Sequence, residues 1–217
     1  MIVIRVAIGC SEQISYNPFI EVNDILQIKL SNFTLMNIMK NNLLLQELRK
    51  FSTNHLCTPE EQPTLDRFLQ FLNSNQQCFE RANRGHITSS IWIVNAQKTH
   101  ALLTHHKKFN LWVQLGGHND GESDCKKVAA QEALEESRIS NLTFLHDGIF
   151  DIDIHAIPSA CEYHYDIRYL MQAPEGSNFT VSDESHDLAW VPLDQISAYT
   201  LHSSVLRMNE KFKQHFL

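Results

Sequence analysis

The sequence lacks several features that mark specialised classes of protein. It contains no apolar run of about 18 residues, so we expect no membrane-spanning helix. Its formal net charge of -7 is opposite to the basic excess of a general nucleic-acid binder. Its five cysteines show no paired spacing typical of a metal site, and no credible secretory signal precedes them. We therefore expect reduced thiols, a cytoplasmic protein, and neither a membrane nor a nucleic acid as partner.

The composition that is present is typical of a soluble globular protein. The chain has 217 residues, 43% of them hydrophobic and 20% charged, which suffices for one domain with a sizeable core plus an extension. No internal repeat or low-complexity linker divides it. An acidic chain can still bind a nucleotide, because Mg²⁺ would neutralise part of the phosphate charge.

A cluster of three glutamates organises the chain. The stretch 116–139 reads GGHNDGESDCKKVAAQEALEESRI, and Glu132, Glu135 and Glu136 follow its glycine-rich turn. Their spacing places them on one face of a helix, called here the box helix, where like charges repel each other. Such a cluster needs either a compensating cation or a solvated face. Hard ions such as Mg²⁺ prefer carboxylate oxygens, so the pattern favours a metal site over a merely exposed acidic face.

The same stretch resembles the signature of the Nudix (MutT-like) hydrolases. Gly117 falls on the first glycine of that signature, Glu132, Glu135 and Glu136 fall on its acidic positions, and Ile139 falls on its last apolar position. The resemblance implies an α/β fold, a Nudix-type α/β/α sandwich with a mixed β-sheet. It implies that the glutamates and the Gly117 carbonyl hold Mg²⁺ or Mn²⁺. It also implies a pyrophosphohydrolase that cleaves the diphosphate linkage of a nucleoside diphosphate derivative, a small-molecule substrate.

Three positions depart from the signature. Ser123 stands where the family has its first glutamate, Gln131 where it has arginine, and Arg138 where it has a late glycine. In the family the first glutamate and the arginine help to hold the loop to the helix; a Ser123–Gln131 hydrogen bond, or the carboxylate of Glu122, would substitute here. Arg138 in a left-handed conformation would cost up to ~1–2 kcal/mol. These departures leave open a catalytically weak module that binds a nucleotide or regulates.

Two strands with alternating polar residues form a second candidate site. Residues 150–155 and 163–169 alternate apolar and polar side chains, and the short segment between them, which contains Pro158, predicts a hairpin. A symmetric register would pair His155 with His164, Asp153 with Asp166, and Asp151 with Arg168. We predict that this polar face lines the substrate cavity beside the box helix; the alternative is a solvated outer face. Arg168 would contact a phosphate or pair with Asp151.

Further candidates come from the resemblance. The segments FDIDIH, HYDIR and ESHDLAW, and His118 directly after the glycine pair, are similar to a bacterial subgroup of the family, which adds His118 to the substrate-binding candidates. In many Nudix enzymes a loop near Glu184 and His186 supplies a catalytic acid or base. These two residues are therefore candidates for that role, together with Glu135 and Glu136.

The apolar pattern also predicts the domain organisation. We expect residues 1–35 to be an extension that is disordered or not native, with Met36 or Met39 as the natural start. Residues 36–84 are expected to form a helical segment with one helix at 37–51 and another at 59–73, the second capped by Thr58. This segment is expected to pack on the main domain or on a second subunit of a homodimer. The Nudix domain spans 85–217. Its strands are expected at 87–94, 101–104, 111–115, 150–155, 163–169 and 188–191, and its helices after Ser123 or Asp124, at 192–198 and from 203 onward.

Two other functions compete with hydrolysis. A Nudix-fold isomerase acting on a prenyl diphosphate would need a catalytic cysteine, for which Cys161 and Cys125 are the candidates. A purely structural protein with an acidic helix would leave the loop glycines unexplained. The sequence does not predict which substrate is used, because base and sugar recognition depends on loops.

Overall fold

The computed structural model describes residues 22–81, 85–157 and 161–217, without the side chains of residues 22–33, 161 and 162. The chain divides into two compact units, Met1–Met36 and Asn37–Leu217. Residues 1–21 of the predicted extension lie outside the described residues, and a natural start at Met36 or Met39 stays a prediction.

The first helix begins earlier than expected. Helix α1 spans Val22–Ser52, whereas the apolar pattern predicted a start at residue 37. No glycine or proline interrupts residues 19–52, so nothing in the local sequence ends the helix within that stretch. In the second unit its apolar stripe is buried at Leu44, Leu45 and Leu48 and joins the main core.

The second helical segment follows the predicted signals. A 3₁₀ turn, η1 (Pro59–Glu61), leads directly into α2 (Gln62–Ser74), which buries Leu65, Phe68 and Leu72. The backbone N–H of Thr58 donates to Glu61 Oε2 at 2.9 Å, so Glu61 closes the start of the turn. The prediction of a helix at 59–73 is confirmed, with a 3₁₀ first turn.

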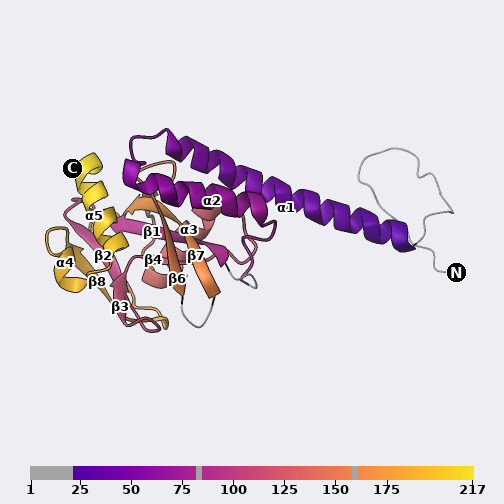
Figure 1. Ribbon diagram of the computed structural model, residues 1–217. Helices are drawn as coiled ribbons and strands as arrows, with labels where there is room; N and C mark the ends of the chain where they lie inside the picture. The colour runs from indigo at the N-terminus through magenta and orange to yellow at the C-terminus, as the bar shows by residue number, and fades with distance from the viewer. Residues whose placement is uncertain (1–21, 82–84, 158–160) are drawn as a thin grey trace, which may run out of the picture. The chain divides into compact units, whose positions relative to one another are not determined.

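The centre of the second unit is one mixed sheet of eight strands (Figure 1). The strands are β1 (Gly85–Val94), β2 (His100–His106), β3 (Leu111–Val113), β4 (Leu115–His118), β5 (Thr143–Phe144), β6 (Asp151–Ile157), β7 (Cys161–Gln172) and β8 (Ser185–Pro192). Along its main path the order is β3-β2-β1-β7-β5, while β4 pairs with β1, β6 with β7 and β8 with β2. Strands β1 and β7 run parallel, and the other pairs are antiparallel.

Two expected boundaries are wrong for identifiable reasons. The single strand predicted at 111–115 is two strands, because β3 pairs with β2 whereas β4 pairs with β1. The helix predicted to start at Pro192 starts later, as α4 (Ile196–Tyr199). Pro192 is instead the last residue of β8, opposite His100, a strand-end position that a residue without an N–H tolerates.

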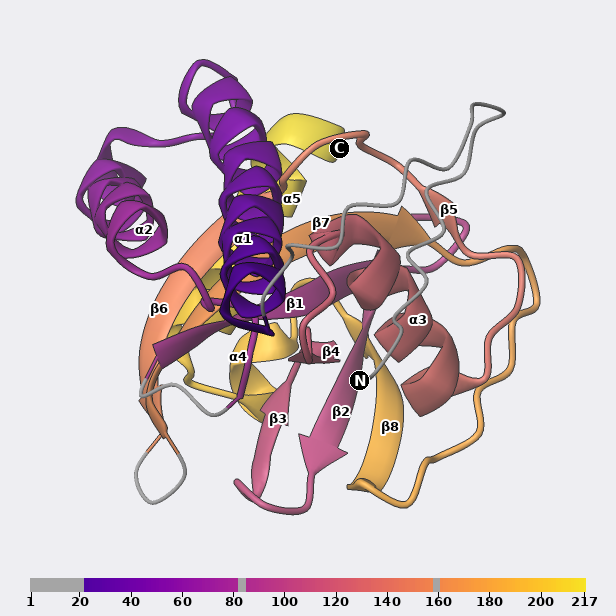
Figure 2. The ribbon, with the colours of Figure 1, turned by 90° about the vertical axis from the view of Figure 1, so that its right-hand side faces the viewer.

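Helices lie on both faces of the sheet (Figure 2). The box helix α3 (Cys125–Ser137) lies on the face that includes Ser89, since Ser89 Oγ donates to Asn119, which contacts Cys125. Helix α5 (Ser203–Phe216) lies on the opposite face, where Arg168 donates to Ser204 Oγ at 3.2 Å. The expected α/β/α arrangement is therefore present. Among the described residues, none of the helices combines the length and apolar character that a membrane crossing requires.

The predicted hairpin pairs in the predicted register. Strands β6 and β7 are antiparallel, with Asp151 opposite Arg168, Asp153 opposite Asp166, and His155 opposite His164. Alternation of side chains then places these six residues on the face of the sheet that α5 covers. The prediction that this polar face lies beside the box helix is wrong, because α3 packs on the other face.

Candidate functional site

The loop and helix that carry the glutamates are closely fitted together. Strand β4 delivers Gly116, Gly117 and His118, and α3 begins after Asp124, whose side chain accepts the backbone N–H of Lys127 at 2.9 Å. Of the two predicted caps, Asp124 is therefore the one used. At the other end Arg138 adopts the left-handed conformation, with φ of 59°, that the departure from glycine had predicted. A Cβ at Gly117 would overlap the Glu132 carboxylate, so only glycine allows this approach.

Two of the three box glutamates point into the protein. Glu136 is only 5% exposed, and its Oε1 accepts the backbone N–H of Gly116 at 2.7 Å. Burial raises the pKa of Glu136 to about 8 despite that hydrogen bond. Burial, together with the charges of Glu135 and Glu184, raises the pKa of Glu132 to about 7. A cation bound beside these two carboxylates would favour their charged forms.

Glu135 differs from its two neighbours on α3. Its side chain is exposed and accepts a hydrogen bond from Gln131 Nε2 at 2.9 Å. Gln131 thus bonds within the helix rather than to Ser123, the partner that the sequence suggested. The three carboxylates share one helix face, but Glu136 is buried, Glu132 is half-buried and Glu135 is open to solvent.

A different ion pair ties the loop to the helix. Glu122 Oε2 accepts from Lys127 Nζ at 2.6 Å, and Glu122 Oε1 accepts the backbone N–H groups of Ser123 and Asp124. The Lys127 hydrogen bond and these N–H groups lower the pKa of Glu122 to about 2. The suggested substitute carboxylate is therefore engaged in the loop. Lys40 of α1 adds a second tie, because its Nζ donates to the Gly121 carbonyl at 2.6 Å.

The two acid or base candidates have different surroundings. Glu184 is exposed, and its charge contributes to the raised pKa values of both Glu132 and Glu136, so it lies within electrostatic reach of the box carboxylates. Its carbonyl accepts the backbone N–H of Lys107 at 3.1 Å, which fixes the loop to the end of β2. His186 is also exposed, but its ring lies 5.2 Å from that of His105.

The polar face of β6 and β7 is neither an open cavity nor a solvated surface at its centre. Arg168 and Asp166 are each 1% exposed, and Arg168 Nε donates to Asp166 Oδ2 at 2.7 Å. Arg168 also pairs with Asp151 at 3.1 Å and with Asp153 at 3.3 Å. Of the two roles predicted for Arg168, pairing with Asp151 is the one that forms. Asp166 and Arg168 do not reach an open site as predicted, because they bond each other.

Charges from α5, which the sequence did not link to this face, complete the network. Arg207 makes a bidentate pair with Asp151, at 3.1 and 2.8 Å. Lys211, itself buried, pairs with Asp151 at 2.9 Å and with Glu61 at 2.6 Å. Burial alone would raise the pKa of Asp151, but Lys211, Arg207 and Arg168 together hold it below its usual range. We call these residues the Arg168 network: Glu61, Asp151, Asp153, Asp166, Arg168, Arg207 and Lys211.

Histidines gather at the end of the same face. His86 of β1 pairs with His164 of β7, and His118 lies opposite Thr88, two residues along β1. His155 lies next to His164, with ring centroids 5.3 Å apart, and its Nδ1 is 3.1 Å from Asp153 Oδ2. Burial lowers the pKa of His118 to about 4 and that of His164 to about 3, with further lowering by neighbouring positive groups. The predicted residues His118, His155 and His164 are thus brought together.

The sequence reading missed His86, although its signal was present. His86, Thr88 and Ser90 alternate along β1 in the same way as the polar residues of β6 and β7. Arg81 was also missed: it pairs with Asp120 in the glycine-rich loop, and the charge of Glu132 helps to raise its pKa.

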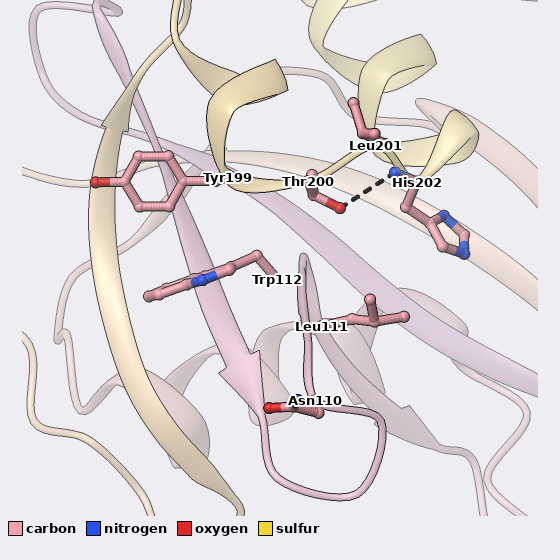
Figure 3. Close-up of a pocket in the computed structure, with 7 residues that line it drawn as sticks. All are labelled: Asn110, Leu111, Trp112, Tyr199, Thr200, Leu201 and His202. Atoms are coloured by element: carbon pink, nitrogen blue, oxygen red, sulfur yellow. Dashed lines mark hydrogen bonds between the residues drawn. The ribbon is translucent and has the colours of Figure 1, made fainter.

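A cavity of about 410 Å³ lies where β3 meets the end of α4 (Figure 3). Trp112 and Tyr199 form an edge-to-face pair with centroids 5.3 Å apart, and Trp112 stacks on His105 at 5.0 Å. Leu111, Leu201 and His202 are further lining residues (Figure 3). The charges of Asp153 and His155 act on His202, which connects this cavity to the polar face. Aromatic walls with a few polar groups suit a flat ring.

The donor set at the box fits a hard divalent cation. Glu132, Glu135 and Glu136 offer carboxylate oxygens from one helix face. Burial is the main cause of the raised pKa values of Glu132 and Glu136. Mg²⁺ and Mn²⁺ prefer such oxygen ligands.

Comparisons with known proteins agree with this geometry. The sequence model of the family described as NUDIX domain matches residues 85–212. Among solved structures, the chain resembles a complex of the Ap4A hydrolase of C. elegans, with a TM-score of 0.53, 17% identity, and coverage of 59% of this chain and 95% of that one. It also resembles a NUDIX-family hydrolase from Clostridium perfringens, with a TM-score of 0.51, 21% identity, and coverage of 61% and 98%. The search of curated proteins finds no match.

Proposed function

We propose, from the premise that this chain belongs to the NUDIX domain family, that it cleaves the diphosphate linkage of a nucleoside diphosphate derivative with the help of a divalent cation. The enzyme class follows from the family, whose hydrolases act on phosphorus-containing anhydrides. The observation that carries the proposal is the pair formed by the half-buried Glu132 and the buried Glu136, for which desolvation opposes the charged form. Carboxylates whose burial costs stability and perturbs their pKa values are typical of functional sites.

The box residues hold the cation in this proposal. Glu132, Glu135, Glu136 and the Gly117 carbonyl are the ligands for Mg²⁺ or Mn²⁺. The cation, when bound, supplies charge neutralisation of the diphosphate and activates the attacking water. The backbone N–H of Gly116 orients Glu136 through its 2.7 Å hydrogen bond. The Glu122–Lys127 pair holds the loop at the start of the helix, and Gly117 of that loop lies beside the Glu132 carboxylate.

Glu184 is the proposed general base. Proton transfer needs a carboxylate or imidazole that reaches the water, and Glu184 is exposed yet within electrostatic reach of Glu132 and Glu136. His186 is a candidate because it lies at the start of β8, close to Glu184 in the chain. It ranks second because its ring lies against that of His105. The cavity of Trp112 and Tyr199 is the proposed place for the base of the nucleotide.

The test is a turnover assay with Mg²⁺ against a panel of nucleoside diphosphate derivatives, scored for phosphate-containing products. Glu136→Gln keeps the shape of the side chain and an acceptor for the Gly116 N–H, so it should fold and yet lose at least ~100-fold in kcat. Glu60→Gln, in the exposed first turn of η1, is the matched control and should keep full activity. Unchanged turnover in Glu136→Gln would remove Glu136 from the mechanism.

A nucleotide-binding module without turnover is the second candidate, and it draws on Ser123 and Gln131 replacing the family's charged pair. Against it, Glu122 and Lys127 already supply a charged tie between loop and helix. The same panel separates the two functions: measurable binding of a nucleotide without release of product by the wild-type protein would favour the module.

A further inference from the structure

We propose that His86, His118 and His164 form a second metal site that takes a transition metal such as Zn²⁺ and is separate from the carboxylate site for Mg²⁺. The one nitrogen that each ring offers lies within 4.8 Å of the other two. No function discussed above uses these three side chains together. The proposal does not depend on the proposed function, because it concerns metal binding and not turnover.

The fold itself brings the three rings together. His86 and His164 are direct partners on the parallel strands β1 and β7, and His118 pairs with the position two residues along β1 on the antiparallel strand β4. All three therefore project from the same face of three adjacent strands. Their ring centroids lie 4.9 to 5.0 Å apart. Hydrogen-bonded strands give this triangle a rigid base, as a preorganised site requires.

The geometry suits a tetrahedral ion with small ring rotations. Nitrogen ligands bind Zn²⁺ at about 2.0–2.1 Å, which places neighbouring nitrogens about 3.3 Å apart around a tetrahedral ion. The rings must approach by about 1.5 Å at most from their present limit of 4.8 Å. Three neutral imidazoles are ligands typical of Zn²⁺, Cu²⁺, Ni²⁺ and Co²⁺, and not of Mg²⁺.

A buried polar atom points to a missing partner. His164 Nε2 is buried and has no hydrogen-bond partner among the described residues. Buried polar atoms are seldom left without one, because desolvation costs free energy that only a bond repays. A metal ion between the rings would bond each nitrogen at once.

The surroundings match those of a site with an open position. Three protein ligands leave one position of a tetrahedral ion for water or a substrate group. His118 and His164 are half-buried whereas His86 is buried, so the open position faces outward from β1. His155 borders the site, next to His164. Asp153 holds the His155 ring through the 3.1 Å contact between Asp153 Oδ2 and His155 Nδ1. Contacts of this carboxylate–histidine kind orient histidines around metals.

The test uses Co²⁺ as the probe, because its visible absorption is intense in tetrahedral sites and weak in octahedral ones. The full-length protein is titrated with Co²⁺ while excess Mg²⁺ occupies the carboxylate site. We expect one Co²⁺ per chain with tetrahedral absorption. His118→Ala and His164→Ala should each lower the affinity by at least ~100-fold, the upper range for loss of an outer-shell partner. His100→Ala, which removes a half-buried histidine of β2 that contacts Thr99, should bind as wild type does.

Two further measurements keep the outcome decisive. Glu132→Gln/Glu136→Gln should retain Co²⁺ binding, which separates this site from the proposed catalytic one. X-ray absorption of the wild-type protein with Zn²⁺ should show a first shell with three imidazoles, and it requires no variant to fold. A shell of oxygen ligands, displacement of Co²⁺ by Mg²⁺, or unchanged affinity in both His118→Ala and His164→Ala would overturn the proposal.

Discussion

The box carboxylates and the Arg168 network both include buried acids, on opposite faces of one sheet, but among the described residues only the network pairs its buried acids with arginine and lysine. Arg168, Arg207 and Lys211 pair with the acids of the network, and the pKa of Asp151 is held below its usual range. On the other face, burial raises the pKa of Glu136 to about 8, and the nearest charges are those of other acids. The network satisfies its own charges, whereas no arginine or lysine of the described residues pairs with Glu136.

The difference separates structural roles from functional ones. A buried acid that is matched by arginine and lysine has little capacity left for a ligand; Asp166 and Arg168, each 1% exposed, bond each other and do not face an open site. A buried acid without a partner costs stability and keeps its capacity for a cation. Buried charge by itself therefore does not indicate a binding site; the balance of charge around it does.

Removing the centre of the network should have the largest effect on stability. Arg168→Met would leave Asp151, Asp153 and Asp166 buried without their shared partner, and such a loss costs ~3–5 kcal/mol. Urea unfolding followed by circular dichroism measures the change. Arg81→Met, which removes an exposed arginine paired with Asp120, is the control and should cost less than ~1 kcal/mol. Equal effects of the two variants would contradict the distinction between buried and exposed pairs.

Removing charge from the box should instead leave the metal-free fold intact and abolish its response to Mg²⁺. A ligand present at 100-fold over its Kd stabilises a protein by ~2.7 kcal/mol. Wild type should gain about that amount on saturation with Mg²⁺, and Glu132→Gln/Glu136→Gln should gain almost none. In EDTA at pH 8 the double variant should be at least as stable as wild type, because it buries no charge. Thermal unfolding with and without Mg²⁺ measures both quantities, and a variant that still responds to Mg²⁺ would refute the assignment.

The two clusters should also respond to pH in opposite directions. The folded-state pKa values of Glu132 and Glu136 are raised from 4.5, so their contribution in metal-free protein is present below pH 4.5 and is lost as pH rises through 7 and 8. The pKa of Asp151 and that of Asp153 are lowered from 3.8, so their contribution is present above pH 3.8 and is lost as pH falls further. The stability of Glu132→Gln/Glu136→Gln relative to wild type in EDTA should therefore rise by several kcal/mol from pH 4.5 to pH 8, because each pKa unit corresponds to ~1.4 kcal/mol. The lowered pKa values of His118 and His164 act on both proteins alike and cancel in this difference. Saturating Mg²⁺ should remove the rise, and a difference that does not change with pH in EDTA would contradict the raised pKa values.

Some features of the box helix and of the polar face could be predicted from the sequence, and others could not. Alternation of polar and apolar residues sufficed to predict the register of β6 and β7, because the short connection between them allows few pairings. Helix spacing likewise placed Glu132, Glu135 and Glu136 on one face. The strand register and the shared helix face both depend on residues that are close in the sequence, so patterns in the sequence suffice to predict them.

Burial and partners depended on contacts between distant segments. Arg207 and Lys211 lie more than 50 residues from Asp151, and no local pattern links them to it. For the same reason the sequence could not say that α3 and the polar face lie on opposite sides of the sheet. The tie between Glu122 and Lys127 is predicted only in part. The sequence indicates Glu122 as a substitute carboxylate, but nothing in it indicates Lys127 as the partner.

Breaking the tie between loop and helix should have the smallest effect and be visible mainly in catalysis. The Glu122–Lys127 pair is exposed, and pairs of this kind contribute at most ~1 kcal/mol to stability. Its proposed role is to hold the loop that presents the Gly117 carbonyl, so Lys127→Met should lower kcat/KM a few-fold with little change in Tm. Lys213→Met breaks the exposed pair with Glu210 on α5 and is the matched control for loss of a lysine. If both variants reduce kcat/KM equally, the loop tie has no specific role, and the substitutions at Ser123 and Gln131 would then be uncompensated.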